Sequence, residues 1–284
     1  IFGQTRYQTM AALVEKGEWK QGGTAIVASG GNFPDALSAS SLAGRLDAPV
    51  ILTGSTSLST EAANQLKNLS PSKVYVIGGE SAVSASTYRQ IQNITGKKCT
   101  VERIAGQTRY ETSVKIASNP AFKQVKTVII VTGTNYADAL SISPYAYAMG
   151  YPILLCDPIK GLTGEEFNFV HEMDYDHAIL VGGTSAVPQH VENQLKWRAI
   201  HDQIRLSGAT RYETSANILD FETHAIGLKT DGMFLATGKN FPDALAAGPV
   251  AAKKGTVLLL VDPGMQTTCK TLGEYKGSIS NAYI

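Results

Sequence analysis

Short apolar runs alternate along the chain with longer segments in which apolar residues recur at helical spacing. The runs are rich in Ile, Val and Leu, and glycine bounds many of them. Such runs are typical of strands buried on both faces of a parallel sheet. Strands are therefore predicted within residues 26–28, 49–53, 73–79, 127–135, 152–156, 177–183, 231–240 and 256–261, with edge strands within 99–106 and 202–208.

Helices are predicted directly after these strands, across short connections. Three of them open with an Asn-x-x-Asp sequence, in which the Asn is expected to cap the helix and the Asp to lie in its first turn. This alternation predicts α/β units with parallel sheets, helices on both faces and right-handed crossovers. Further helices are predicted at 59–69, 84–94, 164–172, 188–197 and 267–275.

A repeated motif divides the chain into three similar parts. IFGQTRYQT at 1–9 recurs as IAGQTRYETS at 104–113 and as LSGATRYETS at 206–215. The Arg of the motif returns after 109 − 6 = 103 residues and again after 211 − 109 = 102 residues, which is the length of a small domain. The predicted modules are 1–102, 103–204 and 205–284. The third is expected to be C-terminally incomplete, because residues 281–284 match a third strand without the Gly-Gly that follows it elsewhere.

Each copy of the motif carries the signature of a helix start. Its Thr is followed three residues later by Gln or Glu, as in Thr108 and Glu111, which predicts a capping box. The Tyr begins an apolar stripe at helical spacing and is predicted to be a core residue. The neighbouring Arg lies in the first turn, where the helix dipole disfavours a cation, so an anionic partner is expected.

Composition limits the possible functions. Hydrophobic residues make up 43% and charged residues 17%, as in a folded protein, and the net charge is +1, so any anion site must be local. This charge disfavours nucleic acid as a partner, and no apolar run is long enough for membrane insertion. Cys99, Cys156 and Cys269 do not follow the repeat, which argues against a disulfide framework, a metal site or a cofactor built on cysteine.

Candidate ligand-binding residues lie where the predicted strands end. In parallel sheets, ligands collect beyond the carboxyl ends of the strands, where loop N–H groups and helix N-termini meet. Gly-Gly turns there either serve tight packing or let the backbone approach an oxyanion. The candidates are Asn32, Asp35, Gly78, Gly79 and Ser81 in the first module, Asn135, Asp138, Gly182, Gly183 and Ser185 in the second, and Asn240 and Asp243 in the third.

Two roles remain open for the recurring arginines Arg6, Arg109 and Arg211. Each could pair with the Asp of a neighbouring module and so fix how the modules dock. Each could instead hold a phosphate or carboxylate ligand, since guanidinium suits bidentate contacts with anions.

No catalytic constellation is found. The sequence has no GxxxxGK[ST], HExxH, GxSxG or CxxC, and none of its five His recurs at an equivalent position. We therefore predict a protein without catalytic activity of its own.

Four ordered motifs resemble the cell wall binding repeat 2 family of Gram-positive surface proteins: RIAGQTRYETSVKIA, GTNYADALSISPYA, PILLCDP and AILVGGTSAVP. The resemblance covers essentially the whole chain in three tandem copies. It implies three Toprim-like or flavodoxin-like modules packed around a pseudo-threefold axis. It also implies that the chain holds a secreted protein non-covalently on the cell wall through an anionic polysaccharide, with an amidase, protease or adhesin as the effector elsewhere.

The resemblance places module docking and polymer contact on the Arg, Asn-x-x-Asp and Gly-Gly-x-Ser positions given above. The sequence departs from the pattern at Ala137, where the other copies have Pro34 and Pro242, and in the incomplete third module, which is expected to weaken closure of the ring. The alternative function is a phosphate- or nucleotide-binding α/β enzyme or sensor. A third possibility is a structural scaffold whose repeats bind only one another.

Overall fold

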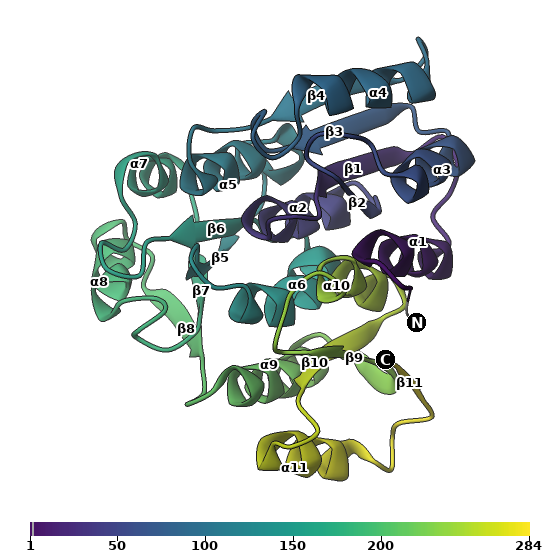
Figure 1. The fold of residues 1–284 in the computed structure, drawn as a ribbon. Coiled ribbons are helices and arrows are strands. Elements are labelled where there is room, and N and C mark those ends of the chain that lie inside the picture. The colour runs from purple at the N-terminus through teal and green to yellow at the C-terminus, as the bar shows by residue number, and fades with distance from the viewer. Residues whose placement is uncertain (2) are drawn as a thin grey trace.

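The computed structural model describes residue 1 and residues 3–284; Phe2, within the first copy of the motif, lies outside the described residues. Within them the chain forms three separate sheets of four, four and three strands (Figure 1). All strand pairs within these three sheets are parallel, which confirms the predicted α/β class.

The first two modules repeat one topology. The central strand of each sheet is the first in sequence, and the last strand lies at the edge, in the orders β2-β1-β3-β4 and β6-β5-β7-β8. The first module comprises α1 (Arg6–Gly17), β1 (Thr24–Ser29), α2 (Pro34–Arg45), β2 (Val50–Thr53), α3 (Thr60–Leu69), β3 (Lys73–Ile77), α4 (Ala85–Thr95) and β4 (Thr100–Ile104). The second comprises α5 (Arg109–Ala117), η1 (Pro120–Phe122), β5 (Thr127–Thr132), α6 (Ala137–Met149), β6 (Ile153–Cys156), α7 (Gly164–Glu172), β7 (His177–Val181), α8 (Gln189–Trp197) and β8 (Asp202–Leu206).

The third module has the strand order β10-β9-β11. Its elements are α9 (Arg211–Ala225), β9 (Lys229–Thr237), α10 (Ala244–Lys253), β10 (Thr256–Val261), α11 (Gln266–Tyr275) and β11 (Asn281–Tyr283). The predicted module boundaries at 102/103 and 204/205 fall inside β4 and β8, which complete the sheets of the first and second modules.

The helices that follow the first strand of each module pack together at the centre of the molecule. Helix α6 lies against both α2 and α10, and α10 also contacts α2 and α1 (Figure 1). These helices are rich in buried small residues, so their backbones come close. A Cβ added at Gly44 of α2 would lie 2.0 Å from the carbonyl oxygen of Tyr147 in α6. Glycine is therefore required where these two modules meet.

The ring of modules closes in spite of the short third module. One aromatic residue from each module meets the other two near the axis: the ring centroids of Phe33, Tyr136 and Phe241 are 5.5–5.7 Å apart. Edge-to-face and tilted arrangements of this kind are favourable for aromatic rings. The expectation that an incomplete third module would weaken closure is not borne out by these contacts.

The predicted Asn caps are placed differently in the structure. Helices α2 and α6 begin after Phe33 and Tyr136, so Asn32 and Asn135 lie one residue before the cap position. Asn135 Oδ1 still accepts a hydrogen bond from the N–H of Ala137 at 3.2 Å. Asp35 and Asp138 lie in the first turn as predicted, whereas Asp243 is itself the cap residue of α10.

Candidate ligand-binding clefts between the modules

The repeated motif builds the start of the first helix of each module. Thr108 Oγ1 accepts a hydrogen bond from the Glu111 N–H at 3.2 Å, as a capping Thr should. The return bond differs from the predicted capping box: Glu111 Oε2 accepts from the N–H of Gln107 at 2.7 Å, one residue before the cap. The other copies do the same, with Gln8 accepting from Gln4 and Glu213 from Ala209.

The Gly and the second Thr of the motif fasten the incoming chain to this helix. The Gly106 N–H donates to Thr112 Oγ1 at 3.0 Å, and the bond recurs at Gly3 and Gly208. A Cβ at Gly106 would lie 2.3 Å from the Cβ of Glu111, so only glycine allows this approach. The motif thus fixes the direction in which the chain enters each module.

Each recurring Arg bridges two modules. Arg109 Nη1 donates to the Gly133 carbonyl of its own module at 2.6 Å, while its guanidinium lies 5.8 Å from the Phe33 ring of the first module. Such a cation–π contact contributes on the order of 0.5–1 kcal/mol at an exposed site. Arg211 is placed likewise on Gly238 and Tyr136, and Arg6 on Gly30 and Phe241.

Pairing with carboxylates, one of the two roles that the sequence leaves open for these arginines, is not formed. No N···O distance within 4.0 Å joins Arg6, Arg109 or Arg211 to a carboxylate among the described residues. A backbone carbonyl and an aromatic face take the place of the expected anion, because both present negative charge density to the guanidinium. The Arg therefore has a docking role that needs no ion pair.

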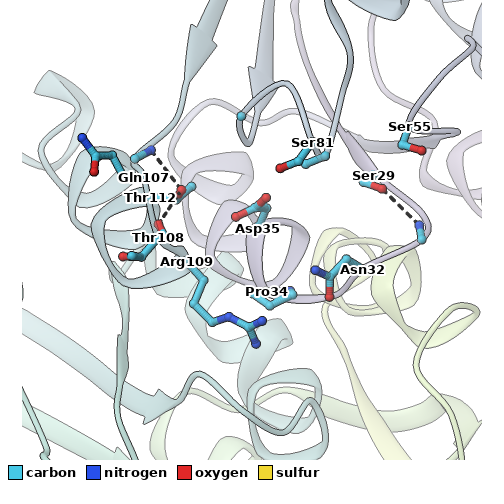
Figure 2. Close-up of a pocket in the computed structure, with 14 residues that line it drawn as sticks. Ser29, Asn32, Pro34, Asp35, Ser55, Ser81, Gln107, Thr108, Arg109 and Thr112 are labelled. Carbon is cyan, nitrogen blue, oxygen red and sulfur yellow. Dashed lines mark hydrogen bonds between the residues drawn. The ribbon is translucent and has the colours of Figure 1, made fainter.

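A cleft of about 370 Å³ lies between the first and second modules. Four segments line it: the end of β1 with the start of α2, the loop after β2, the turn between β3 and α4, and the motif that opens the second module (Figure 2). The backbone N–H groups of Gly79, Glu80 and Ser81 in that turn donate no hydrogen bond within the part of the chain that the structure describes. The predicted residues that line the cleft are Asn32, Asp35, Gly79, Ser81 and Arg109.

Asp35 occupies the middle of this cleft. Figure 2 shows its carboxyl group among the hydroxyls of Ser81, Thr108 and Thr112, whereas the Arg109 guanidinium extends away from it to the edge. Burial raises the pKa of Asp35 above its ordinary value, and the positive charge of Arg109 opposes this only in part. A carboxyl group so placed can accept a hydrogen bond from a hydroxyl, or donate one when it is protonated.

The Gly-Gly turn has a structural explanation. Gly78 has φ +99°, and a Cβ there would lie 2.4 Å from Asp35 Oδ2. Glycine is therefore needed both for the backbone conformation and for the approach of the carboxyl group. Gly182 repeats this arrangement against Asp138, with φ +110° and a distance of 2.5 Å.

The second module meets the third with the same residue types. Asp138 lies beside Gly182, burial raises its pKa, and the charge of Arg211 opposes the shift. Gly183 is half-buried and Ser185 exposed in the turn that corresponds to Gly79 and Ser81. The contact between Asp and Gly in the first module is thus repeated by Asp138 and Gly182 in the second.

The third equivalent position differs. Asp243 is exposed, as is Asn240, and the hollow beside Asp243 has about 210 Å³. Apolar side chains contribute much of its lining, among them Leu13, Phe234 and Ala247. In the first two modules the predicted Asp lies against the Gly-Gly turn. In the third module Asn240 and Asp243 are exposed and meet no such turn among the described residues.

Two sets of residues were not identified from the sequence. The aromatic residues at the axis follow each Asn of Asn-x-x-Asp, and their recurrence as Phe, Tyr and Phe is the signal that could have revealed them. Arg103 donates to the carbonyls of Gly78 at 2.6 Å and Val83 at 2.8 Å, and so holds the Gly-Gly turn in place. Arg205 does the same for Gly182 and Val187. Each stands six positions before the Arg of the next motif.

Neither a membrane-spanning helix nor a cluster of metal-ligating side chains is found among the described residues. No helix of the described residues is long and apolar enough to cross a membrane. Groups of three or more His, Cys, Asp or Glu side chains suited to a metal ion are likewise absent from residues 1 and 3–284.

The chain belongs to the cell wall binding domain 2 (CWB2) family. Residues 1–88, 103–192 and 205–284 each match this family, one match for each predicted module. Two solved cell wall proteins share the fold over 99% of this chain. Cwp6 from Clostridium difficile superposes with a TM-score of 0.87 at 26% identity, and Cwp8 from the same organism with 0.84 at 25%.

Two relatives from Bacillus subtilis (strain 168) are similar in sequence. The N-acetylmuramoyl-L-alanine amidase LytC is 32% identical over 92% of this chain, and the amidase enhancer is 34% identical over 99%. The chain spans 50% and 37% of the length of these relatives and 44% and 48% of the two solved chains. The rest of each relative lies outside the similarity.

Proposed function

We propose that this chain anchors an extracellular protein to the cell wall by binding an anionic wall polysaccharide in the clefts between its modules, without catalysis of its own. One observation carries the proposal. The cleft between the first two modules joins hydroxyl, amide and carboxyl groups, free backbone N–H groups and an arginine at its edge, all from recurring motifs. Membership in a cell wall binding family supports a wall component as the ligand.

The cleft chemistry suits a sugar polymer that carries negative charge. Hydroxyl groups of a sugar can pair with Asp35, Asn32 and Ser81, which face the cleft. A phosphate or carboxylate of the polymer can pair with the free N–H groups of the turn and with Arg109. The raised pKa of Asp35 reduces its repulsion of such an anion as the pH falls.

The equivalent residues in the second and third modules favour a repeating ligand, which can contact both sets at once. When a polymer occupies both, the second contact is intramolecular, and the combined affinity can exceed that of one cleft by about a hundredfold or more. Weak individual contacts can therefore anchor a protein firmly. Higher salt should weaken binding only moderately, because each cleft has few charges.

Co-sedimentation with protein-free Gram-positive walls tests the proposal. We expect the chain to pellet with untreated walls and much less with walls from which hydrofluoric acid has removed the phosphodiester-linked polymers. Ser81 lines the cleft and Ser185 lies in the equivalent turn of the second module, and both are exposed, so the double variant S81D/S185D adds a negative charge at each position without disturbing the core. Its pelleting with untreated walls should fall at least tenfold.

The double variant Q92E/N93D is the matched control, because it adds the same two negative charges on the exposed surface of α4, outside the residues that line the cleft. Its pelleting should equal that of the unaltered chain. Equal pelleting of S81D/S185D and the unaltered chain would contradict binding in the clefts. A thermal shift on addition of ATP would favour the nucleotide-binding alternative.

A further inference from the structure

An exposed Trp and a half-buried Phe form an aromatic pair on the outer side of the second module, away from the cleft. Trp197, the last residue of α8, is 77% exposed, and its ring stacks beside that of Phe167 in α7. The ring centroids are 6.1 Å apart and their planes differ by 22°. Figure 1 shows α7 and α8 at the edge of the molecule, remote from the central helices. The pair therefore faces solvent and not another module.

Arg198 holds the two rings in position from one side. Its guanidinium carbon lies 4.2 Å from the Phe167 ring centroid and 5.3 Å from that of Trp197. Its Nε is buried and has no hydrogen-bond partner among the described residues, and the residue as a whole is half-buried. A cation fixed against the rings restricts their rotation and leaves a preorganised aromatic surface.

The two tryptophans of the chain have different roles. Trp19 is 8% exposed and donates its indole N–H to the Tyr147 hydroxyl at 3.1 Å, as a structural Trp does. The indole N–H of Trp197 makes no hydrogen bond within residues 1 and 3–284. A large aromatic side chain left in water gains little for folding, so Trp197 has no evident structural function.

The pair is specific to the second module. Phe167 stands four residues after the cap residue of α7. The equivalent position in α3, four residues after its cap, is Ala63. Trp197 stands nine residues after the cap of α8, where α4 has Asn93. The first module folds to the same topology without aromatic residues at these positions. The fold therefore does not require them.

Polar side chains border the rings in an open groove of about 650 Å³, lined by Phe167, His190, Asn193, Gln194, Lys196 and Trp197. Gln194 is fixed, because its amide group bonds both the N–H and the carbonyl of Leu162. The side chains of His190, Asn193 and Lys196 form no hydrogen bond or ion pair with any residue that the structure describes. The groove thus combines a flat apolar surface with free hydrogen-bonding groups.

We propose that this groove, the Phe167/Trp197 platform, binds a pyranose ring of the cell wall glycan. The apolar C–H face of a sugar packs on aromatic rings, while its hydroxyl and amide groups need partners at the border, which His190 and Asn193 supply. Lys196 lines the groove and Arg198 lies against the rings, while no carboxylate is among the lining residues, so the platform suits a neutral sugar better than a basic peptide. It lies outside the clefts and does not depend on the anionic ligand proposed for them.

Tryptophan fluorescence of the whole chain provides a direct test, because acrylamide reaches exposed Trp197 far more readily than buried Trp19. N-acetylchitotetraose at millimolar concentration is the probe. We expect it to protect Trp197 from quenching and to shift its emission. Phe167→Ala should weaken this response about three- to tenfold. Unchanged fluorescence with chitotetraose and with purified glycan strands, or protection by a wall stem peptide in their place, would overturn the proposal.

Wall binding provides a second test that separates the platform from the clefts. Residual pelleting with hydrofluoric acid-treated walls should fall about three- to tenfold in Trp197→Ala. The matched control is Ile159→Ala, which removes another exposed apolar side chain of the same module, 81% exposed and outside the groove. Melting temperatures of both variants should match the unaltered chain. Unchanged residual pelleting of Trp197→Ala would refute the platform, whatever S81D/S185D does on untreated walls.

Discussion

The centre of the molecule and its outer surface differ in how far they follow the repeat. At the centre, equivalent aromatic residues precede α2, α6 and α10, and each recurring Arg lies on the aromatic ring of a neighbouring module. On the outside, α8 has an exposed Trp where α4 has Asn93. Residues that hold the modules together must suit every contact of the ring, whereas outward residues are free to differ. The contacts that hold the modules together therefore repeat, whereas the outer surface differs from one module to the next.

The cleft and its counterpart in the second and third modules share features of both regions. Their Asp, Gly and Ser residues recur, yet they contact solvent, and the Arg at their edge also docks the modules. A loss of binding in an Arg109 variant could therefore come from a lost ligand contact or from a lost contact between modules. For this reason the exposed turn residues Ser81 and Ser185 are the sharper probes of the ligand.

The largest effect is expected where two helix backbones touch at the centre. Gly44→Ala would place a Cβ 2.0 Å from the Tyr147 carbonyl oxygen, and the helices would have to separate. We expect a loss of about 3 kcal/mol or more in the free energy of unfolding, measured by urea denaturation.

Gly248→Ala is the matched comparison at the contact between α10 and α6. The nearest atom there is the Ser143 hydroxyl oxygen at 1.8 Å, which belongs to a side chain that can rotate. We expect a smaller loss than for Gly44→Ala. An equal loss in both variants would show that the backbone contact is not the cause.

A pH effect is expected from Glu222, a fully buried residue of α9 at the contact with α6. Its Oε1 accepts a hydrogen bond from the Tyr145 N–H at 3.2 Å, and its Oε2 has no partner among the described residues. Burial raises the pKa of Glu222 well above 4.5, so the folded state binds a proton that the unfolded state releases.

The stability from Glu222 is therefore fully present below its unfolded pKa and declines as the pH rises through the window up to the folded pKa. The slope is about 1.4 kcal/mol per pH unit within that window. Glu222→Gln keeps an acceptor for Tyr145 and does not titrate, so its unfolding free energy should depend less on pH. Urea denaturation at pH 5 and pH 8 measures this, and parallel pH curves for both proteins would contradict a neutral Glu222.

The smallest effect is expected from one hydroxyl at the axis. Arg211 Nη1 donates to the Tyr136 hydroxyl at 3.0 Å, and this hydroxyl donates to the Gly238 carbonyl at 3.2 Å. Phe33 and Phe241 have no such group. Tyr136→Phe should cost about 0.5–1.5 kcal/mol in unfolding free energy. The reciprocal Phe33→Tyr tests whether a hydroxyl beside Arg109 stabilises the other contact, and an unchanged Tyr136→Phe would mean that water replaces the bond.

Local features of the fold were predictable from the sequence. The bounds of α7 and β10 agree with the predicted 164–172 and 256–261, because periodicity and strand length are properties of short segments. The three-module organisation also followed from the repeat and is confirmed. The start of α2 was misplaced by one residue, since Asn32 bonds the Phe33 N–H and not the helix.

The sequence by itself determined the repeat, the order of strands and helices, and the motifs that reach the carboxyl ends of the strands. These depend on interactions between residues close together in the chain. Only the tertiary structure decided the partner of each Arg, the aromatic cluster at the axis and the pairing of Phe167 with Trp197. These contacts join residues far apart in sequence, and their geometry depends on how whole modules and helices pack.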